Sequence, residues 1–423
     1  MAAEAVRRVV VVGQGYVGLP LALRAVAVGM DVVGYDVDGD RVKRLAAGQS
    51  FVEDVPDEEL AAALRTGRYT ATDEARRCAG FDVAVITVPT PLRDGNPDLS
   101  HIELAARTLA RFLRPGACVV LESTTYPGTT EELVAGLLEE GSGLAAGKDF
   151  RLGYSPERID PGNKVWTLVN TPKVVSGIDA ESLREVQRFY DALVERTVVV
   201  SSCKEAELTK LLENTFRHVN IALVNELAMF AADLGIDVWS AIDAASTKPF
   251  GYLRFTPGPG VGGHCLPIDP SYLSWRVRRS LGRSFRFVEL ANDVNDHMPD
   301  YLVHRLLLAL NRRGRAVRGS RVLLLGLAYK RNTSDVRESP TLAIVERLAA
   351  MGADVRVTDP HVLEDGCDPV VVRVELTGDE VDAADAVVVV VDHDAFDLEM
   401  VSRRAAYVLD SRRCLSGEQV EHL

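Results

Sequence analysis

A single cysteine beside a glycine-rich turn is the residue of this sequence best suited to covalent chemistry. Residues 257–270 read PGPGVGGHCLPIDP, with four glycines within six residues just before His264 and Cys265. Glycines let a backbone approach a ligand closely, and Pro267 or Pro270 suits the first turn of a following helix. A thiol beside a helix N-terminus has a lowered pKa, which favours the nucleophilic thiolate. Isolated cysteines more often pack in cores, but the Gly-Gly-His setting favours a nucleophile at Cys265.

Other residues able to assist such chemistry lie far apart in the chain. Lys210 and Asn214 are four positions apart in a helical pattern, so they share a helix face and could hold an oxyanion or a water molecule. The alternative for this pair is a solvated helix face. Glu157 follows a β-like stretch and offers a base, and Thr124 places a hydroxyl just after a predicted strand. His264 is either a base beside the thiol or a structural donor.

A second chemical signal stands near the start of the chain. A valine-rich run at 9–12 leads into a G-x-G-x-x-G motif made of Gly13, Gly15 and Gly18. Such a turn between strand and helix binds the pyrophosphate of a dinucleotide, and Asp36 falls where a carboxylate accepts hydrogen bonds from the adenosine ribose. The carboxylate of Asp36 would repel a 2′-phosphate, so NAD is favoured over NADP. Arg41 leaves open an adenine-stacking or NADP-tolerant role. The alternative is a glycine turn with a surface aspartate and no bound dinucleotide.

The elements that must position these residues follow a repeated β-α-β pattern. Short Val/Ile-rich runs alternate with amphipathic stretches over 1–202, which predicts a doubly wound parallel sheet. Residues 203–315 are expected to form a helical middle domain, with one long helix from 205 to 234 and a Gly/Pro-rich loop over 247–270. A second α/β unit is expected over 316–423. The predicted fold class is therefore α/β, with two Rossmann-like domains joined by a long central helix.

The second α/β unit differs from the first at its glycine turn. Gly326-Leu327-Ala328-Tyr329-Lys330 follows the first strand of this unit but lacks the spaced glycines of a dinucleotide site. A lysine at the carboxyl end of a strand is suited to a substrate phosphate, with surface solvation as the alternative for Lys330.

Composition narrows the class of protein further. The chain has 423 residues, 48 Lys plus Arg and 61 Asp plus Glu, so its formal net charge of −13 disfavours a nucleic-acid partner. Six scattered cysteines suggest neither a disulfide scaffold nor a zinc framework, and a reducing cytoplasm is expected. The histidines form no metal-binding cluster, so no metal is predicted. The apolar stretch ending at Leu23 is too short to span a membrane, and no membrane partner is expected.

Taken together, these segments resemble the UDP-sugar 6-dehydrogenases of the UDP-glucose/GDP-mannose dehydrogenase family, most closely the bacterial UDP-N-acetylglucosamine 6-dehydrogenase branch. The likeness covers almost the whole chain in the right order. Besides the glycine motif with Asp36, it rests on V88-P-T90, S123-T124, S155-P-E157, K210-x-x-x-N214, G262-G-H-C265-x-x-x-D269, Y329-K330 and R337-E-S339.

The resemblance implies an enzyme that oxidises the C6 alcohol of a UDP-sugar to a uronic acid through a cysteine thiohemiacetal and thioester, reducing two NAD per sugar. The catalytic residues it implies are Cys265, Lys210, Asn214, Asp269, Glu157 and Thr124. The cofactor residues it implies are Gly13, Gly15, Tyr16, Val17, Gly18, Asp36, Arg41, Thr90, Thr124 and Arg337. The substrate residues it implies are Glu157, Lys210, Asn214, Arg254, Phe255, Gly262 and Lys330. It also implies a homodimer, or a larger homo-oligomer, formed through the long central helix.

Several alternatives stay open at the level of sequence. The chain departs from UDP-glucose enzymes after Glu157 and over 247–251, where their sugar-contacting arginine is missing, but UDP-glucose and UDP-N-acetylmannosamine remain alternative substrates. A two-electron hydroxy-acid dehydrogenase would use Lys210 and Asn214 for one hydride transfer and leave Cys265 as a packing residue. An NAD-dependent sensor without turnover is disfavoured, because every proposed catalytic position carries a competent residue.

Overall fold

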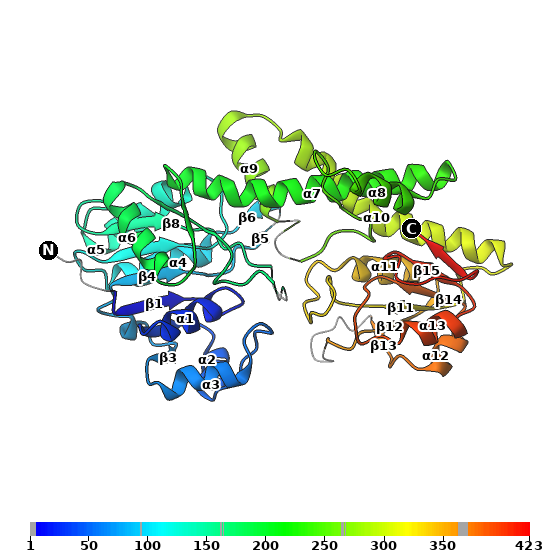
Figure 1. Ribbon diagram of the computed structural model, residues 1–423, viewed down its shortest axis with the longest axis horizontal. Helices are drawn as coiled ribbons and strands as arrows, with labels where there is room; N and C mark the ends of the chain where they lie inside the picture. The colour runs from blue at the N-terminus through cyan, green and yellow to red at the C-terminus, as the bar shows by residue number, and fades with distance from the viewer. Residues whose placement is uncertain are drawn as a thin grey trace. The chain divides into compact units, whose positions relative to one another are not determined.

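The computed structural model describes residues 6–93, 95–160, 163, 165–263, 266, 268–362 and 371–423. The chain divides into two compact units (Figure 1). The first comprises Met1–Glu213 and Ser271–Gly282, and the second comprises Asn214–Pro270 and Arg283–Leu423.

The first unit is built on an eight-stranded sheet with the order β10-β9-β8-β7-β4-β1-β2-β3. Its strands are β1 (Arg8–Val12), β2 (Asp31–Tyr35), β3 (Tyr69–Thr72), β4 (Val83–Ile86), β7 (Cys118–Leu121), β8 (Arg151–Tyr154), β9 (Lys173–Gly177) and β10 (Thr197–Val199). A separate hairpin pairs β5 (Leu92–Arg93) with β6 (Asn96–Pro97). β2 and β3 lie on one side of β1, and β4 lies on the other. The strand order therefore reverses between β1 and β4, and open α/β sheets bind ligands at such a topological switch point.

The direction of two strands differs from the sequence prediction of a parallel sheet. β9 pairs with β8 in the antiparallel sense, and β10 then runs parallel to β9. The amino end of β9 therefore lies at the same edge of the sheet as the carboxyl ends of β7 and β8. The pattern of Val/Ile runs cannot reveal this reversal, because a buried strand has the same composition in either direction.

Helices cover both faces of the first sheet. Helices α1 (Gly18–Ala27), α3 (Asp57–Arg65) and α6 (Ala180–Asp191) share one core with Val9 and Val11 of β1, while α4 (Ser100–Ala110) packs against β4. The remaining helical segments of this unit are α2 (Gly39–Ala46), α5 (Ala135–Ser142), the 3-10 turn η1 (Ala75–Cys78) and the π-helical segment η2 (Thr129–Val134).

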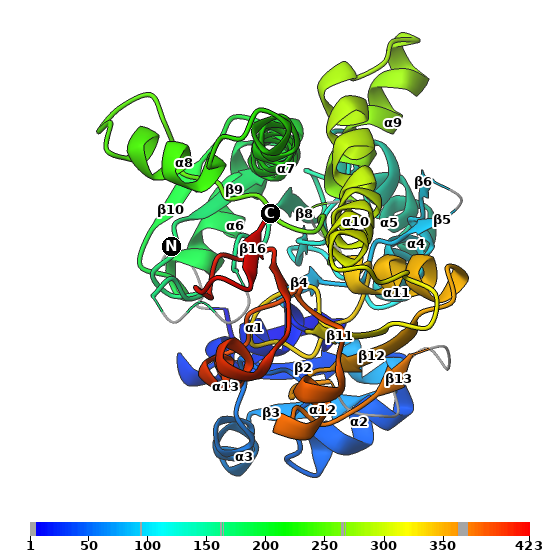
Figure 2. The same ribbon diagram turned by 90° about the vertical axis from the view of Figure 1, so that its right-hand side faces the viewer.

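The second unit holds a six-stranded sheet with the order β13-β12-β11-β14-β15-β16, parallel throughout. Its strands are β11 (Arg321–Leu325), β12 (Asp354–Thr358), β13 (Val372–Arg373), β14 (Ala386–Val389), β15 (Val408–Asp410) and β16 (Val420–His422). Alternate residues of β11 serve opposite cores: Val322 and Leu324 pack with α10 (Arg286–Arg312) and α11 (Pro340–Ala350), whereas Leu323 and Leu325 pack with α12 (Gly378–Ala383) and α13 (Leu398–Arg404). Figure 2 shows these helix pairs on the two sides of the sheet.

Long helices form the middle of the chain, as the sequence predicts. Helix α7 (Cys203–Asp233) has 31 residues, and its first part belongs to the first unit and the rest to the second. α8 (Val238–Ser246) follows it, and α9 (Asp269–Leu281) carries Pro270 in its first turn. The predicted α/β fold with two Rossmann-like halves and a long central helix is confirmed. In the part of the chain that the structure describes, no helix is long and apolar enough to cross a membrane.

Candidate active site

The glycine motif of the first unit forms a cradle after β1. A Cβ atom on Gly13, whose φ is +91°, would lie 2.7 Å from the carbonyl oxygen of Thr87, and one on Gly18 would lie 1.8 Å from the carbonyl oxygen of Gly13. The first and third glycines are therefore required by packing. A Cβ on Gly15 would instead meet nothing within 4 Å, so the loop leaves open space beside the start of α1. These features fit a pyrophosphate held by backbone N–H groups.

Asp36 is anchored beside this loop at the end of β2. One carboxylate oxygen accepts the N–H of Gln14 at 2.8 Å and the other accepts the N–H of Asp38 at 3.0 Å. Arg41 lies within 3.2 Å of Asp38 and 4.0 Å of Asp36. The carboxylate thus stands where it can accept hydrogen bonds from a ribose, and a cation stands next to it.

A serine links two of the loops that the sequence assigns to the cofactor. The hydroxyl of Ser123 donates to the carbonyl oxygen of Val88 at 2.8 Å, which joins the segment before Thr124 to the segment before Thr90. The next residue, Pro91, accepts a hydrogen bond from the Tyr272 hydroxyl of α9 at 3.2 Å. Tyr16 and Val17 lie in the glycine loop itself, with Tyr16 exposed.

Lys210 is fixed by its place on α7, one turn after a buried glutamate. The carboxylate of Glu207 accepts the N–H of Gly128 at 2.6 Å and the N–H of Thr130 at 2.9 Å. These bonds attach α7 to the loop that carries Thr124, within the first unit. Lys210 itself is buried.

Asn214 and Asp269 are brought together in the second unit. The side-chain amide of Asn214 donates to a carboxylate oxygen of Asp269 at 2.5 Å, and both residues are buried. The bond holds the start of α9 against α7, although 55 positions separate the two residues. Cys265 and His264, the residues that the sequence singled out, lie outside the described residues.

The glycines before Cys265 pack on two other motifs of the second unit. A Cβ on Gly262 would lie 2.6 Å from the carbonyl oxygen of Glu338, and one on Gly263 would lie 2.7 Å from the Tyr329 ring. The N–H of Gly263 donates to the carbonyl oxygen of Arg337 at 2.9 Å. The structure therefore brings three separate sequence motifs into one place. The Arg337 guanidinium pairs with Asp335 at 2.6 Å.

A pocket lined by three arginines lies within the second unit. Its volume is about 330 Å³, and Arg217, Arg254 and Arg412 contribute to its walls together with Ile221 and with residues 255, 256, 258 and 260 of the loop. Arg254 pairs with Asp243 of α8 at 2.8 Å, and Arg412 donates from Nε to the carbonyl oxygen of Val390 at 2.7 Å. Guanidinium groups in such a pocket suit a phosphate or diphosphate ligand.

Buried asparagines hold this loop in place. The side-chain oxygen of Asn225 on α7 accepts the N–H of Gly258 at 2.9 Å, and its amide donates to Asn295 of α10 at 2.9 Å. Both asparagines are buried, so the hydrogen bonds fix the backbone of the pocket wall.

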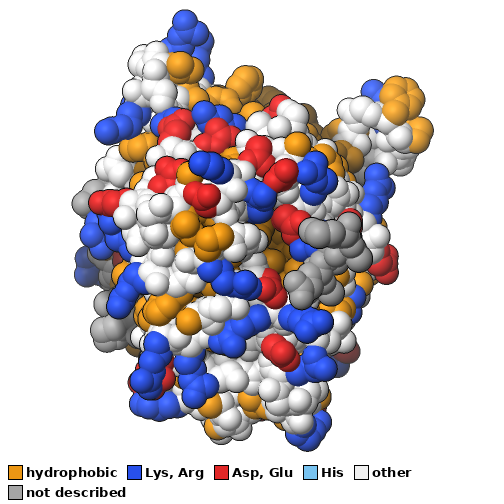
Figure 3. All heavy atoms as spheres, turned by 90° about the vertical axis from the view of Figure 1, so that its left-hand side faces the viewer, with side chains coloured by type: hydrophobic (Ala, Val, Ile, Leu, Met, Phe, Trp, Pro, Cys, Tyr) orange, Lys and Arg blue, Asp and Glu red, His pale blue; other side chains and the backbone are white. Residues whose placement is uncertain are grey.

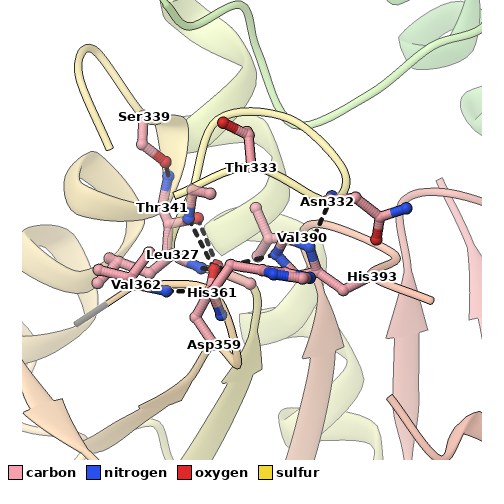
Figure 4. A network of polar contacts seen from close by, with 12 residues as sticks. Leu327, Asn332, Thr333, Ser339, Thr341, Asp359, His361, Val362, Val390 and His393 are labelled. Carbon is pink, nitrogen blue, oxygen red and sulfur yellow. Dashed lines mark hydrogen bonds and ion pairs between the residues drawn. The ribbon is translucent and has the colours of Figure 1, made fainter. Parts of the chain in front are cut away.

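The loop that carries Lys330 is held by a second carboxylate network (Figure 4). Asp359, at the end of β12, accepts the N–H groups of Leu327 and Ala328 at 2.7 and 2.9 Å and the Nε2–H of His393 at 3.0 Å. The other ring nitrogen of His393 accepts the N–H of Asn332 at 2.9 Å. Asp359 directly follows the second strand of this unit, as Asp36 does in the first unit. Its carboxylate accepts the hydrogen bonds of the loop N–H groups.

Charges are mixed on the face of the molecule drawn in Figure 3, where acidic and basic side chains are interspersed. Among the described residues, no group of three or more His, Cys, Asp or Glu side chains is arranged to hold a metal ion.

Comparison with known proteins identifies the family. Family models match three successive parts of the chain: the NAD binding domain at residues 7–194, the central domain at 204–297 and the UDP binding domain at 323–417. The chain belongs to the UDP-glucose/GDP-mannose dehydrogenase family. It is thus an NAD-dependent dehydrogenase, and the predicted family, enzyme class and cofactor are confirmed.

Individual relatives cover nearly the whole chain. It is 38% identical over 421 residues to the UDP-N-acetyl-D-mannosamine dehydrogenase of Pyrococcus horikoshii, which covers 98% of this chain and 97% of the relative. It is 39% identical over 357 residues to the UDP-N-acetyl-D-glucosamine 6-dehydrogenase of Pseudomonas aeruginosa, which covers 84% of this chain and 83% of that one. A solved structure of the UDP-D-ManNAc dehydrogenase from P. horikoshii has a TM-score of 0.89 and 35% identity, with 98% of each chain covered.

Sequence reasoning missed residues that only the folded chain reveals. Arg217 lies three positions after Asn214 on α7, and helical spacing could have indicated it as a neighbour on the same face. Arg412 comes from the end of the second sheet, and no local pattern connects it with Arg254.

Proposed function

We propose that this dehydrogenase oxidises the C6 alcohol of a UDP-sugar to the carboxylate in two steps, with UDP-N-acetylglucosamine as the first candidate substrate. The observation that carries this proposal is the arginine-lined pocket, because its wall is the loop that continues five residues later into Cys265. A diphosphate bound by the arginines would direct the attached sugar toward the thiol. The two relatives compared above act on N-acetylated hexosamines, which supports an N-acetylated sugar.

Cys265 supplies the nucleophile in this mechanism. The first oxidation removes a hydride and a proton from the alcohol to give an aldehyde, and the thiolate adds to its carbonyl carbon as a thiohemiacetal. Loss of a second hydride from that adduct gives a thioester. Water then adds to the thioester carbonyl and the C–S bond breaks, which releases the acid and the thiol. NAD, when bound, accepts the hydride in each oxidation.

The other catalytic residues stabilise charge and move protons. The ammonium group of Lys210 stabilises the oxyanions formed at C6. Asn214 and Asp269, joined by their hydrogen bond, orient the water and its proton. Glu157 acts as the base for thioester hydrolysis, with Thr124 holding the water.

Substrate and cofactor would be held by the surrounding residues. Asp36 and the open space beside Gly15 fit the ribose and pyrophosphate of NAD, with Tyr16, Val17, Arg41, Thr90 and Arg337 as further cofactor residues. The UDP moiety would be held by Lys330, Arg254, Phe255 and the backbone at Gly262, and the pocket adds Arg217 and Arg412.

We also propose that the enzyme forms homodimers, or larger homo-oligomers, through α7. One row of apolar side chains on this helix and the residue that follows it is 43% to 73% exposed in the single chain, and it consists of Leu208, Leu212, Phe216, Leu223, Leu227, Phe230 and Leu234. A row of this length on one helix is typical of a buried interface. A reducing cytoplasm is the proposed compartment, and the described cysteines, Cys78, Cys118, Cys203 and Cys414, are all free thiols.

A substrate panel tests the reaction. Purified protein with NAD should convert one of UDP-glucose, UDP-N-acetylglucosamine, UDP-N-acetylgalactosamine and UDP-N-acetylmannosamine to its uronic acid, with two NADH released per sugar. One NADH per substrate with no acid formed would contradict the four-electron reaction and favour a two-electron dehydrogenase.

A cysteine variant tests the covalent route. Cys265→Ala should retain NAD binding and lose acid formation by at least about 100-fold, because no thioester can form. Continued acid formation by this variant at the rate of the unmodified enzyme would contradict the thioester mechanism.

A further inference from the structure

Glu157 belongs to a buried ionic cluster at one edge of the first sheet. Glu122 directly follows β7, Glu157 lies three residues after β8, and Lys173 opens β9. Because β9 is antiparallel to β8, its first residue reaches the edge at which β7 and β8 end. The side chains of Lys173, Glu122 and Glu157 are 3%, 0% and 11% exposed, so all three are removed from water.

Every oxygen of the Glu157 carboxylate has a partner. Oε1 accepts the backbone N–H groups of Arg158 and Ile159, both at 2.6 Å. Oε2 accepts a hydrogen bond from the Lys173 ammonium group at 2.9 Å. This carboxylate therefore has a fixed orientation rather than a free choice of rotamers.

Lys173 also contacts the second carboxylate. Its ammonium group bonds to Oε1 of Glu122, and the Tyr190 hydroxyl of α6 donates to the other oxygen of Glu122. Arg158, another charged neighbour, is paired with Glu213 of α7 at 2.7 Å. Among the described residues, the groups that face Glu157 are Lys173, Glu122 and, through Glu122, Tyr190.

The cluster has two acids and one base, so it would bury one excess negative charge if all three groups were ionised. Burying such a charge is costly, and a proton retained on one carboxyl removes this cost. Three donors, one of them cationic, stabilise the anion of Glu157, and Glu122 is the more deeply buried acid. Burial raises the pKa of Glu122, whereas the charge of Lys173 and the hydrogen bonds outweigh burial and lower the pKa of Glu157.

We propose that Lys173 and Glu122 are positioning residues for the hydrolytic step: Lys173 holds Glu157 as an oriented anion, and Glu122 carries the proton that the cluster retains. This inference rests on the proposed role of Glu157 in thioester hydrolysis. It adds that the base stays ionised throughout the working pH range because of a lysine that touches neither substrate nor cofactor.

Removal of the Lys173 charge is the direct test. In Lys173→Met, kcat for acid formation should fall about 100-fold while kcat/KM changes less than about twofold, because only the hydrolysis that follows formation of the covalent adduct loses its general base. The acidic limb of the kcat profile should move up by at least about one pH unit, since Glu157 loses its cationic partner. Acid-quenched enzyme should carry a covalent sugar adduct on Cys265, detected by mass spectrometry.

Three further variants separate charge from packing. Lys173→Arg keeps the positive charge and should restore the acidic limb of the unmodified enzyme. Glu122→Gln and Tyr190→Phe leave the pair of Lys173 with Glu157 intact, so both should keep that limb as well. If Lys173→Met does not fold, the double variant Lys173→Gln/Glu122→Gln, which leaves no unpaired charge at these two positions, should show the same shift.

The possible results distinguish this inference from the proposed function. Two NADH per sugar in the unmodified enzyme, together with an unmoved acidic limb in Lys173→Met or in the double variant, would overturn the positioning role alone. A shift in Glu122→Gln as large as that in Lys173→Met would also overturn it. One NADH per sugar and no adduct in any variant would overturn the proposed function, and this inference with it.

Discussion

At the residue scale, the glycines of the dinucleotide loop are required for two different physical reasons. A side chain at Gly18 would collide with the backbone of Gly13, whereas a side chain at Gly15 would point into space that the protein leaves open. The first constraint acts on the folded protein itself. The second acts only when the cofactor is bound.

This difference predicts opposite effects for two substitutions. Gly15→Val should leave the thermal midpoint nearly unchanged and weaken NAD binding at least about tenfold, because its side chain fills the space for the pyrophosphate. Gly18→Ala should lower the free energy of unfolding by about 1–3 kcal/mol without NAD present, because the extra methyl group overpacks the turn. Calorimetry of unfolding and titration with NAD measure the two effects. Equal loss of stability in both variants would refute this assignment.

At the scale of elements, α7 presents an apolar row that the single chain leaves exposed. Its members lie three, four or seven residues apart from Leu208 to Leu234, so they share one face of the helix and of the residue that follows it. The opposite side of the same helix contributes buried residues such as Leu211, Ala228 and Asn225. α7 therefore has a buried face and, on its other side, an apolar row that the described part of the chain leaves largely exposed.

The proposed interface on α7 predicts that charging this row separates the protomers. The double variant Leu223→Glu/Leu227→Glu should be monomeric by light scattering coupled to gel filtration, with an unchanged circular dichroism spectrum, because two carboxylates would be buried at the interface. Leu104→Glu on α4 is a matched control, since Leu104 is 52% exposed and Leu223 is 53% exposed. A monomeric unmodified protein, or dissociation of the control, would contradict an interface on α7.

The pairing of Asp359 with His393 joins three loops of the second unit, which follow β11, β12 and β14. His393→Ala removes a donor to Asp359 and leaves the N–H of Asn332 without its acceptor, so the free energy of unfolding should fall by about 1–3 kcal/mol. Because the Lys330 loop is one of the three, KM for the UDP-sugar should rise more than kcat falls. Denaturant unfolding and steady-state kinetics check both effects.

His361 provides the control for this prediction. Its ring lies 4.8 Å from that of His393, but its Nε2 atom has no hydrogen-bond partner within the described chain. His361→Ala, which removes the same ring packing but no hydrogen bond of Nε2, should therefore cost less stability than His393→Ala. The reverse order would show that ring packing, rather than the hydrogen bonds, holds these loops.

At the scale of the whole molecule, the two units should respond differently to pH. Burial raises the pKa of Glu207 in the first unit to about 7. Burial alone would also raise the pKa of Asp359 in the second unit, but His393 and backbone N–H groups hold it below its ordinary value. An acid with a raised pKa takes up a proton on folding, so its contribution to stability is lost as pH rises from about 4.5 to 7. The contribution of Asp359 is instead lost as pH falls below about 3.8.

Scanning calorimetry between pH 5 and 7.5 should show this contrast. The unfolding transition of the first unit should lose stability as pH rises. Glu207→Gln should remove the contribution of Glu207, up to about 3 kcal/mol, and leave that of Glu122, whose pKa burial also raises. Asp359→Asn should lower the transition of the second unit at pH 7 and leave the first unchanged. A pH dependence of the first transition that Glu207→Gln does not alter would contradict the assignment.

The sequence by itself determined the features that depend on neighbouring residues. The glycine turn with Asp36, the buried strands and the long helix were all predicted, because strand composition, helical spacing and turn geometry are local properties. The sequence pattern does not indicate the edge strand β3, since it is short and partly exposed.

Only the tertiary structure decided which distant residues meet. The reversed direction of β9 places Lys173 beside Glu157, and the second sheet brings Arg412 to the loop of Arg254. The helical pattern of α7 contained its apolar residues, but it could not tell which of them the rest of the chain would cover. Such contacts depend on strand order and direction, which a local pattern does not encode, because the same buried strand or amphipathic helix fits several arrangements.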